Sequence, residues 1–196
     1  MSWHSGEIEK YDYGYKSGTC YPFMGEKKWQ TWSKTFSPLA KSEKILDAGC
    51  GPGLTVLAGL IDGYDMWGTD ISPYLLEVIW PVRGLQHRCQ LAFVDEMPFE
   101  DKEFGIILCL GVLEHIPEEG IMPSLKELKR VLKPNGLLCL HIGLKPYPTK
   151  LLGKELHVTI KPREWWKTQL TEVGFSLMET PKMVPKVDLG LVGSYQ

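Results

Sequence analysis

An acid and three alternating glycines are the first residues whose types and spacing could do chemistry. Residues 46–53 read LDAGCGPG, with Asp47 followed by Gly49, Gly51 and Gly53. Without Cβ atoms, the backbone of such a loop can approach a ligand closely and adopt unusual φ angles. A helix after the loop would point its unpaired N–H groups at the same ligand. The pattern therefore predicts a backbone cradle for a small molecule, with a purely structural tight turn as the alternative.

Two ligands fit a glycine-rich turn of this kind, a dinucleotide and S-adenosylmethionine. The dinucleotide fingerprint G-x-G-x-x-G requires a glycine at position 54, where this chain has Leu54. A pyrophosphate would also lie unfavourably close to the Asp47 carboxylate. The zwitterionic methionine tail is more compatible, because the acid can hold its ammonium group directly or through an ordered water. The loop thus favours S-adenosylmethionine over a dinucleotide.

The elements that must position this loop follow from the hydrophobic pattern. Strands are expected at 44–49, 66–71, 89–95, 104–112, 137–143, 175–180 and 189–195. Helices are expected at 52–62, 72–80 (with Ser72 as N-cap), 123–132 and 163–174, with a turn at 133–136. Strand–helix alternation predicts an α/β fold whose ligands lie beyond the carboxyl ends of parallel strands. Two prolines within 181–188 favour a final strand that is short or at the sheet edge.

Composition limits the classes of protein that are possible. The chain has 196 residues, a net charge of −2 and 43% hydrophobic residues, which indicates one ordinary globular domain. The slightly negative net charge argues against strong electrostatic binding to a nucleic-acid backbone. No apolar run approaches the ~18 residues of a membrane span. The N-terminus lacks the basic and apolar regions of a secretory signal. Five cysteines without a CxxC pair favour reduced thiols in the cytoplasm.

From about residue 44 to about 180 the chain resembles the class I S-adenosylmethionine-dependent methyltransferases of the small, single-domain, small-molecule type. The glycine loop, an acid in GTDIS, an acid in FVDEMPF and the segment LGVLEHIP occur in the family's order. The resemblance implies an α/β, doubly wound, mostly parallel seven-stranded sheet, the Rossmann-like methyltransferase fold, with helices on both faces. One domain is expected over 1–196: a helical lid at 1–43, a cofactor-binding core at 44–143, and a substrate-side connection with the last strands at 144–196.

The resemblance also implies which residues contact the cofactor. Asp70 would bind both ribose hydroxyls, since a carboxylate offers two oxygens, and Ile71 would pack on the adenine face. Asp95 would bind the adenine amino group, beside Glu96 and Met97. Asp70 and Asp95 have helix or turn capping as their alternative reading. The remaining expected contacts are Asp47, Gly49, Gly51 and Gly53 in the loop, Leu110 at the methionine end, and Tyr15 from a tyrosine-rich segment that suits a lid.

Methyl transfer from a sulfonium requires alignment of the reactants and exclusion of water more than covalent catalysis, because the leaving group is already activated. An oxygen acceptor would still benefit from a positioned base, an effect of about 10²–10⁴-fold. His115 and His141 are the candidates, although a turn histidine bound to backbone is the alternative for His115. Neither histidine belongs to a recognisable metal-ligand pattern, so metal independence is expected.

The expected activity is therefore methyl transfer from S-adenosyl-L-methionine to a small-molecule acceptor, oxygen ahead of nitrogen, with S-adenosyl-L-homocysteine as product. An NAD-dependent oxidoreductase on a similar fold and a non-catalytic cofactor-binding module are the alternatives. The chain contains no [DN]PP[YF] motif and no Pro-Cys dipeptide, so a nucleic-acid substrate is not expected. We also expect the protein to be a monomer or a homodimer and to have no membrane partner.

Overall fold

The computed structural model describes residues 3–20, 25–36, 39–179 and 188–196. Its centre is a seven-stranded sheet in the order β3-β2-β1-β4-β5-β9-β8. The strands are β1 (Lys44–Ala48), β2 (Asp65–Asp70), β3 (Cys89–Leu91), β4 (Phe104–Leu110), β5 (Leu132–Gly143), β8 (Ser176–Glu179) and β9 (Asp188–Ser194). β1 to β5 run parallel, and β9 runs antiparallel to both of its neighbours. This confirms the doubly wound, mostly parallel fold.

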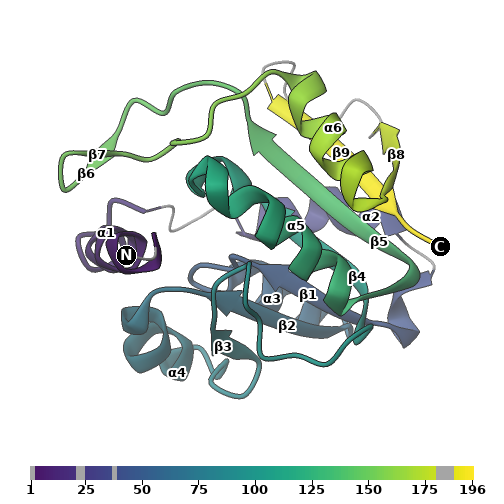
Figure 1. The fold of residues 1–196 in the computed structure, drawn as a ribbon. Coiled ribbons are helices and arrows are strands. Elements are labelled where there is room, and N and C mark those ends of the chain that lie inside the picture. Colours follow the sequence, from purple (N-terminus) through teal and green to yellow (C-terminus); the bar gives the residue numbers. More distant parts are fainter. Residues whose placement is uncertain (1–2, 21–24, 37–38, 180–187) are drawn as a thin grey trace.

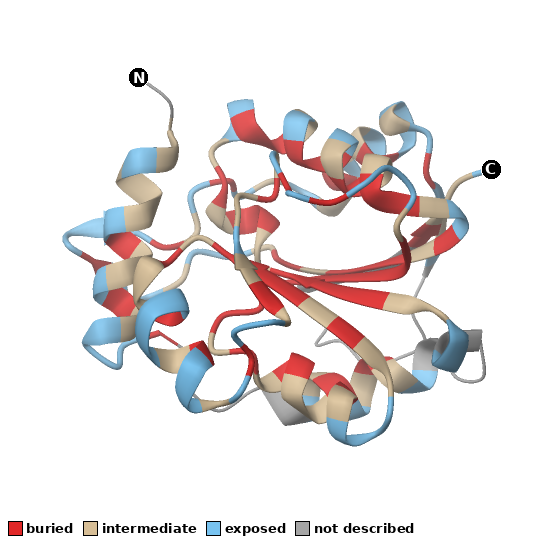
Figure 2. Cartoon of the chain, turned by 90° about the horizontal axis from the view of Figure 1, so that it is seen from below, coloured by how far each residue is buried: buried red, intermediate tan, exposed pale blue. Residues whose placement is uncertain are grey.

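Helices cover both faces of the sheet, as Figure 1 shows. On one face, α2 (Gly25–Phe36) and α3 (Leu54–Ile61) enclose a core that includes Trp29, Met66 and Trp80. On the other face, α5 (Glu118–Val131) and α6 (Arg163–Val173) cover a core around Leu125, Leu138 and Trp166. β4 lies between the two cores and is buried along its whole length, so its sequence FGIILCL is continuously apolar. Figure 2 shows the buried residues following these central strands and the inward sides of the helices.

Most of the remaining elements lie around the carboxyl ends of the strands. α1 (His4–Lys16) lies beside the antiparallel pair β6 (Lys150–Leu151) and β7 (Lys154–Glu155) in Figure 1. A small apolar cluster of Cys20, Leu151 and Leu156 fills the space there, with tyrosines of α1 packed against it. A 3-10 turn, η1 (Leu39–Ser42), leads into β1, and another, η3 (Leu113–His115), follows β4. No helix long and apolar enough to cross a membrane occurs in the described part of the chain.

The helix expected at 72–80 begins at Pro73, so Ser72 stands at the predicted N-cap position, but its hydroxyl donates a hydrogen bond elsewhere and does not accept a helix N–H. It comprises a π-helical turn, η2 (Leu75–Ile79), and α4 (Trp80–Val82). The Tyr74 N–H donates to Oδ1 of Asp12 in α1 at 2.8 Å, and the Ser72 hydroxyl donates to the same oxygen at 2.8 Å. The cap is therefore a carboxylate from a distant helix, which local sequence patterns cannot reveal.

Several boundaries differ from those predicted. α5 begins at Glu118 rather than 123, because acidic residues in its first turn favour the helix and Pro123 removes only one backbone hydrogen bond. The turn expected at 133–136 is an irregularity inside β5, where Asn135 takes φ 62° and the register against β4 shifts. The final strand is not at the edge: β9 lies between β5 and β8. Thr180 and the linker at 181–187 are outside the described residues.

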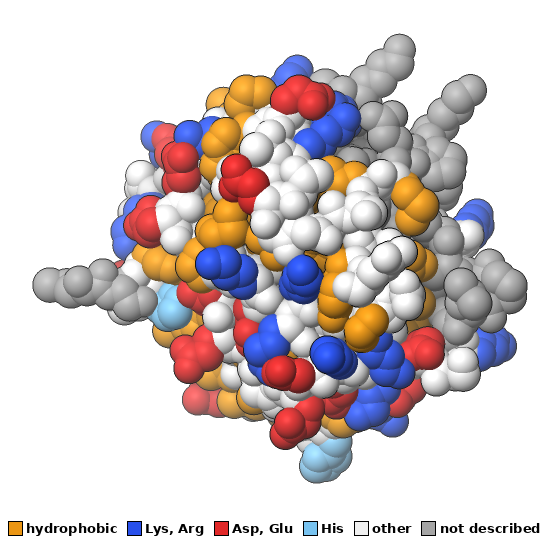
Figure 3. Space-filling view, turned by 45° about the vertical axis from the view of Figure 1, so that its right-hand side comes forward, with side chains coloured by type: hydrophobic (Ala, Val, Ile, Leu, Met, Phe, Trp, Pro, Cys, Tyr) orange, Lys and Arg blue, Asp and Glu red, His pale blue; other side chains and the backbone are white. Residues whose placement is uncertain are grey.

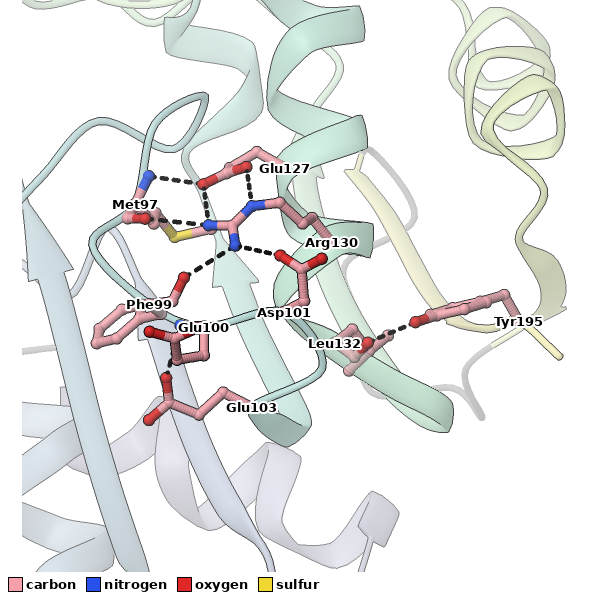
Figure 4. A network of polar contacts seen from close by, with 9 residues as sticks. All are labelled: Met97, Phe99, Glu100, Asp101, Glu103, Glu127, Arg130, Leu132 and Tyr195. Atoms are coloured by element: carbon pink, nitrogen blue, oxygen red, sulfur yellow. Dashed lines mark hydrogen bonds and ion pairs between the residues drawn. The ribbon is translucent and has the colours of Figure 1, made fainter.

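Residues 92–103, all described, connect β3 to β4 without a helix, and β3 ends at Leu91 instead of 95. Arg130 of α5 binds this loop at three residues (Figure 4). Its guanidinium donates to the backbone carbonyls of Met97 and Phe99 and to the carboxylates of Asp101 and Glu127. Glu127 in turn accepts the Met97 N–H at 2.7 Å. The loop is therefore fixed by side-chain hydrogen bonds in place of helical ones.

Candidate active site

A pocket lies beyond the carboxyl ends of β1, β2 and β4 and is bounded on its outer side by α1. Residues from all three strand ends line it, and so does η3. Among the predicted site residues, the lining includes Gly49, Gly51, Ile71, Leu110 and Tyr15. It also includes Asp47, Asp70 and His115. This is the position at which a doubly wound sheet places its ligands.

The glycine loop forms the base of this pocket. The N–H groups of Gly49 and Cys50 both donate to the Thr69 carbonyl at 2.8 Å, which ties the loop to the end of β2. Gly51 has φ 53°, and a Cβ there would point at the Tyr15 hydroxyl, 3.0 Å away. Gly53 also has a positive φ but contacts Leu85 and Trp80 instead and does not line the pocket. Glycine at position 51 thus keeps the pocket open, while Gly53 permits close packing behind it.

Asp70 is 7% exposed and holds the loop in place from the end of β2. Its Oδ2 accepts the Gly51 N–H at 2.9 Å, and its Oδ1 accepts the Ile71 N–H at 2.8 Å. The Tyr15 hydroxyl of α1 donates to Oδ2 at 3.3 Å. Burial raises the pKa of the carboxyl, and these hydrogen bonds oppose the rise. Oδ1 also accepts the Ser72 N–H at 3.3 Å, so the contacts with Tyr15 and Ser72 are the longest of the four and are the ones that a hydroxyl in the pocket would replace.

Asp47 lies at the opposite end of the loop, with Lys28 of α2 beside it. Burial raises the pKa of Asp47 to about 6, while Lys28 and a hydrogen bond from Thr55 lower it. The Lys28 ammonium donates to the Leu110 carbonyl at 3.0 Å and lines the pocket. An acid and a base at one end of a cavity suit the two charges of an amino-acid tail. Lys28 was missed at the sequence level, because its helix precedes the first strand and has no motif.

The loop after β3 is placed differently from the expectation. Asp95, Glu96 and Met97 are outside the residues that line the pocket, whereas Ala92, Phe93 and Val94 line it. Both Asp95 oxygens contact His4 Nε2 of α1, at 2.9 and 3.0 Å, and the His4 ring stacks on Phe93. Glu96 is exposed, and the Met97 side chain is buried in the core. Adenine contacts from these three remain predictions.

His115 and His141, the two predicted catalytic residues, do not lie together. His115 lines the pocket at η3, and its Nδ1 is 2.9 Å from the Leu156 carbonyl oxygen. Burial is the main reason that its pKa falls to about 3, so the ring is neutral. His141 lies within β5, outside the pocket lining, and its carbonyl accepts the Gly111 N–H at 2.8 Å. The geometry favours His115 for contact with a substrate.

Comparison with known proteins identifies the class. Residues 46–140 match the family described as "Methyltransferase domain". An uncharacterized protein of Haemophilus influenzae is 31% identical over 80% of this chain and 67% of its own length. The ubiquinone biosynthesis O-methyltransferase of Coxiella burnetii is 28% identical over 63% of this chain and 54% of its own length. A TehB-like SAM-dependent methyltransferase from Corynebacterium glutamicum has TM-score 0.69 at 20% identity, covering 98% of this chain and 100% of that one.

The chain therefore belongs to the class I S-adenosylmethionine-dependent methyltransferases. S-adenosylmethionine is its methyl donor, and the nicotinamide-dependent alternative is set aside. The pocket fits that cofactor. A Cβ at position 51 would fill the cradle, and the Asp70 carboxylate lines the same space. Asp47, on the neighbouring strand, and Lys28 provide opposite charges in the lining.

Proposed function

We propose that this enzyme methylates an oxygen of a small-molecule acceptor. The observation that carries the proposal is the place of His115, a neutral ring at the pocket wall beyond Leu110. With its Nδ1–H donated to the Leu156 carbonyl, the lone pair is on Nε2, which can accept a hydrogen bond from a hydroxyl. The relative from Coxiella burnetii is a ubiquinone biosynthesis O-methyltransferase, which supports the same acceptor atom.

Different residues along the pocket contact different parts of the cofactor and the acceptor. The bound cofactor supplies a methyl group on a sulfonium sulfur that is already an activated leaving group. Asp70 and the Gly51 backbone hold the ribose end, and Asp47 with Lys28 holds the amino-acid tail. Tyr15, fixed on Asp70, excludes water from above. His115 orients the acceptor oxygen toward the methyl group, so that alignment provides most of the rate.

The far end of the pocket indicates an acceptor with an apolar or aromatic body. Two lining residues form that wall beside His115: Tyr11, whose ring lies 5.7 Å from the His115 ring, and Ile116, the next residue in the chain. Positive and negative side chains are interspersed on the face in Figure 3, which fits a small substrate better than a nucleic acid. We infer a monomer or homodimer in the cytoplasm, without a membrane partner. The five cysteines are free and buried, as in a reducing compartment.

Substitution of His115 tests the proposal. With a labelled methyl donor and a panel of phenols, alcohols and amines, methyl transfer should favour the hydroxyl compounds. His115→Ala should lower kcat for them by about 10²-fold or more, since the acceptor loses its hydrogen-bond partner. The dissociation constant of S-adenosylhomocysteine should change by less than twofold.

Two results would contradict this account. Labelling of amines in preference to hydroxyls would move the acceptor to nitrogen, and an unchanged kcat in His115→Ala would remove that residue from the mechanism. If no acceptor in metabolite extracts is labelled while the cofactor still binds, the remaining alternative, a non-catalytic module, is favoured. His87→Ala is the matched control, because His87 is exposed and is not among the residues that line the pocket.

A further inference from the structure

Three potential ligands converge beside the acceptor end of the pocket. Glu114, His115 and His157 each offer one ligand atom, and these atoms lie within 4.8 Å of one another. The rings of His115 and His157 are 4.9 Å apart in an edge-to-face arrangement. The sequence pattern predicted no metal, because His157 belongs to the connection after β5, far along the chain from the Glu-His pair. Only the fold brings the three together.

The backbone fixes this convergence. The N–H groups of Val158 and Thr159 donate to the Glu114 carbonyl at 2.9 and 3.1 Å. The Thr159 hydroxyl donates to the Ile116 carbonyl at 2.6 Å. The segment around His157 is thus bound along η3 on both sides of His115. Rigid placement of ligands before binding is what a metal site requires.

Outer contacts orient each potential ligand. Nδ1 of His115 lies 2.9 Å from the Leu156 carbonyl, and Nδ1 of His157 lies 2.6 Å from the Lys145 carbonyl. Both rings therefore carry their proton on Nδ1, which leaves the lone pair on Nε2, the arrangement found in metal-bound histidines. Glu114 is 2% exposed, and its Oε1 accepts the Gly143 N–H at 2.8 Å. A cation would offset the cost of burying this carboxylate.

We propose that Glu114, His115 and His157 bind one divalent transition-metal ion, with Zn²⁺ as the cation that two imidazoles and a carboxylate suit best. Three protein ligands leave a coordination position for the acceptor. His115 is the one of the three that lines the pocket, so an ion bound to it would be reached by the acceptor from the His115 side. The ion would bind the hydroxyl and lower its pKa, so that the proton is released to water and His115 acts as a ligand. The resulting oxygen anion would then form the O–CH3 bond as the methyl–sulfur bond of the donor breaks, which leaves S-adenosylhomocysteine. This last step rests on the proposed function; the binding of the metal does not.

Metal binding is measured first, without methyl donor or acceptor. Protein stripped with a chelator is titrated with Zn²⁺ by calorimetry, and Co²⁺ substitution is followed by visible absorption. Wild type should bind one ion per chain, with a Co²⁺ spectrum of nitrogen and oxygen ligands. His157→Ala and Glu114→Gln should each weaken Zn²⁺ binding by at least 100-fold. His87→Ala, the exposed histidine, should bind as wild type does. Circular dichroism should show that all variants are folded.

The outcomes separate this inference from the proposed function. Zn²⁺ that does not bind, or that binds equally well to folded His157→Ala, overturns the metal site. In that case the proposed function would be unaffected, because the stripped enzyme would still be expected to methylate hydroxyl compounds. If Zn²⁺ binds as expected, kcat of the stripped enzyme for hydroxyl acceptors should rise at least tenfold on its addition, with S-adenosylhomocysteine affinity unchanged. Binding without this rise supports the metal site and contradicts its role at the acceptor oxygen.

Discussion

At the residue scale, the pKa of Asp47 is a property of the pocket that binding experiments can measure. It is 4% exposed, and burial raises its pKa to about 6, against the opposing influence of Lys28 from α2 and Thr55 from α3. The Asp70 carboxylate on β2 raises it further. An ammonium group in the pocket would favour the charged form of Asp47 and lower this pKa. Cofactor binding is therefore coupled to release of a proton from Asp47.

The coupling predicts a pH dependence with a definite sign. Below pH 6 the free enzyme carries a proton that binding must displace, so affinity falls as pH falls. The dissociation constant of S-adenosylhomocysteine should be about tenfold larger at pH 5 than at pH 7, since one proton corresponds to about 1.4 kcal/mol per pH unit. Calorimetry at both pH values in buffers of different ionisation enthalpy measures the affinity and the proton release.

Asp47→Asn separates this group from others that titrate. The variant should bind more weakly at pH 7 and show a flat profile between pH 5 and pH 7. Glu119→Gln, at an exposed acid of α5, should keep the wild-type profile. A slope that persists in Asp47→Asn would assign the proton to a different group.

Single residues of the site could be predicted from sequence where a strand end fixes them. Asp47 and Asp70 lie at the pocket because β1 and β2 are short, buried and parallel, so their carboxyl ends meet. Asp95 could not be placed in this way. Its strand ends at Leu91, and its partner His4 is 91 residues away in the chain. Contacts of that range depend on how α1 lies against the sheet.

At the scale of elements, α1 is held over the pocket by polar side chains at intervals along its length. His4 contacts Asp95, Asp12 caps the helix after β2, and Tyr15 donates to Asp70. Each contact reaches a loop at the carboxyl end of a strand. α1 is thus joined to the cofactor pocket itself, and the lid expected at 1–43 stays a prediction.

The loop after β3 gives an element-scale prediction. Arg130→Ala removes the hydrogen bonds that fix residues 97–101 and leaves the Glu127 carboxylate without its guanidinium. The free energy of unfolding should fall by about 2 kcal/mol, the scale of lost charged hydrogen bonds. Because Phe93 and Val94 of the same loop line the pocket, S-adenosylhomocysteine should also bind a few-fold more weakly.

Urea unfolding followed by circular dichroism measures this loss. Lys126→Ala is the matched control, since Lys126 lies on the exposed side of the same helix, and its stability should change by less than 0.5 kcal/mol, as is common at surface positions. Equal stability of Arg130→Ala and Lys126→Ala would show that the loop is fixed by something other than Arg130.

Elements with a strong period were predictable and irregular ones were not. β4 follows from an unbroken apolar run and the second part of β5 from the mostly apolar run 137–143, and α6 is capped by Gly174, whose φ of 97° favours glycine. The π-helical turn η2 and the bulge at Asn135 depend on tertiary contacts, the latter on a hydrogen bond from its N–H to the Tyr195 carbonyl. Local propensity carries no signal for either.

At the scale of the whole molecule, the order of strands brings distant segments to one end of the sheet. Sequence alternation predicted the parallel sheet and the end at which a ligand lies. It did not predict that the connection after β5 returns to η3, where Val158 and Thr159 bind the Glu114 backbone. Motifs therefore predicted the glycine loop, Asp47 and Asp70 at the pocket, whereas the places of Lys28 and of the connection after β5 depend on tertiary packing.

The measurement that tests the central claim most directly is calorimetric titration of S-adenosylhomocysteine into wild type and Asp70→Asn at two temperatures. We predict one molecule bound per chain, with affinity lowered 10–100-fold in the variant, because an amide cannot accept the ribose hydroxyls as a carboxylate does, a difference of about 1–3 kcal/mol. Folded wild-type protein that gives no binding heat at either temperature, or an Asp70→Asn variant that binds as tightly as wild type, would contradict the account.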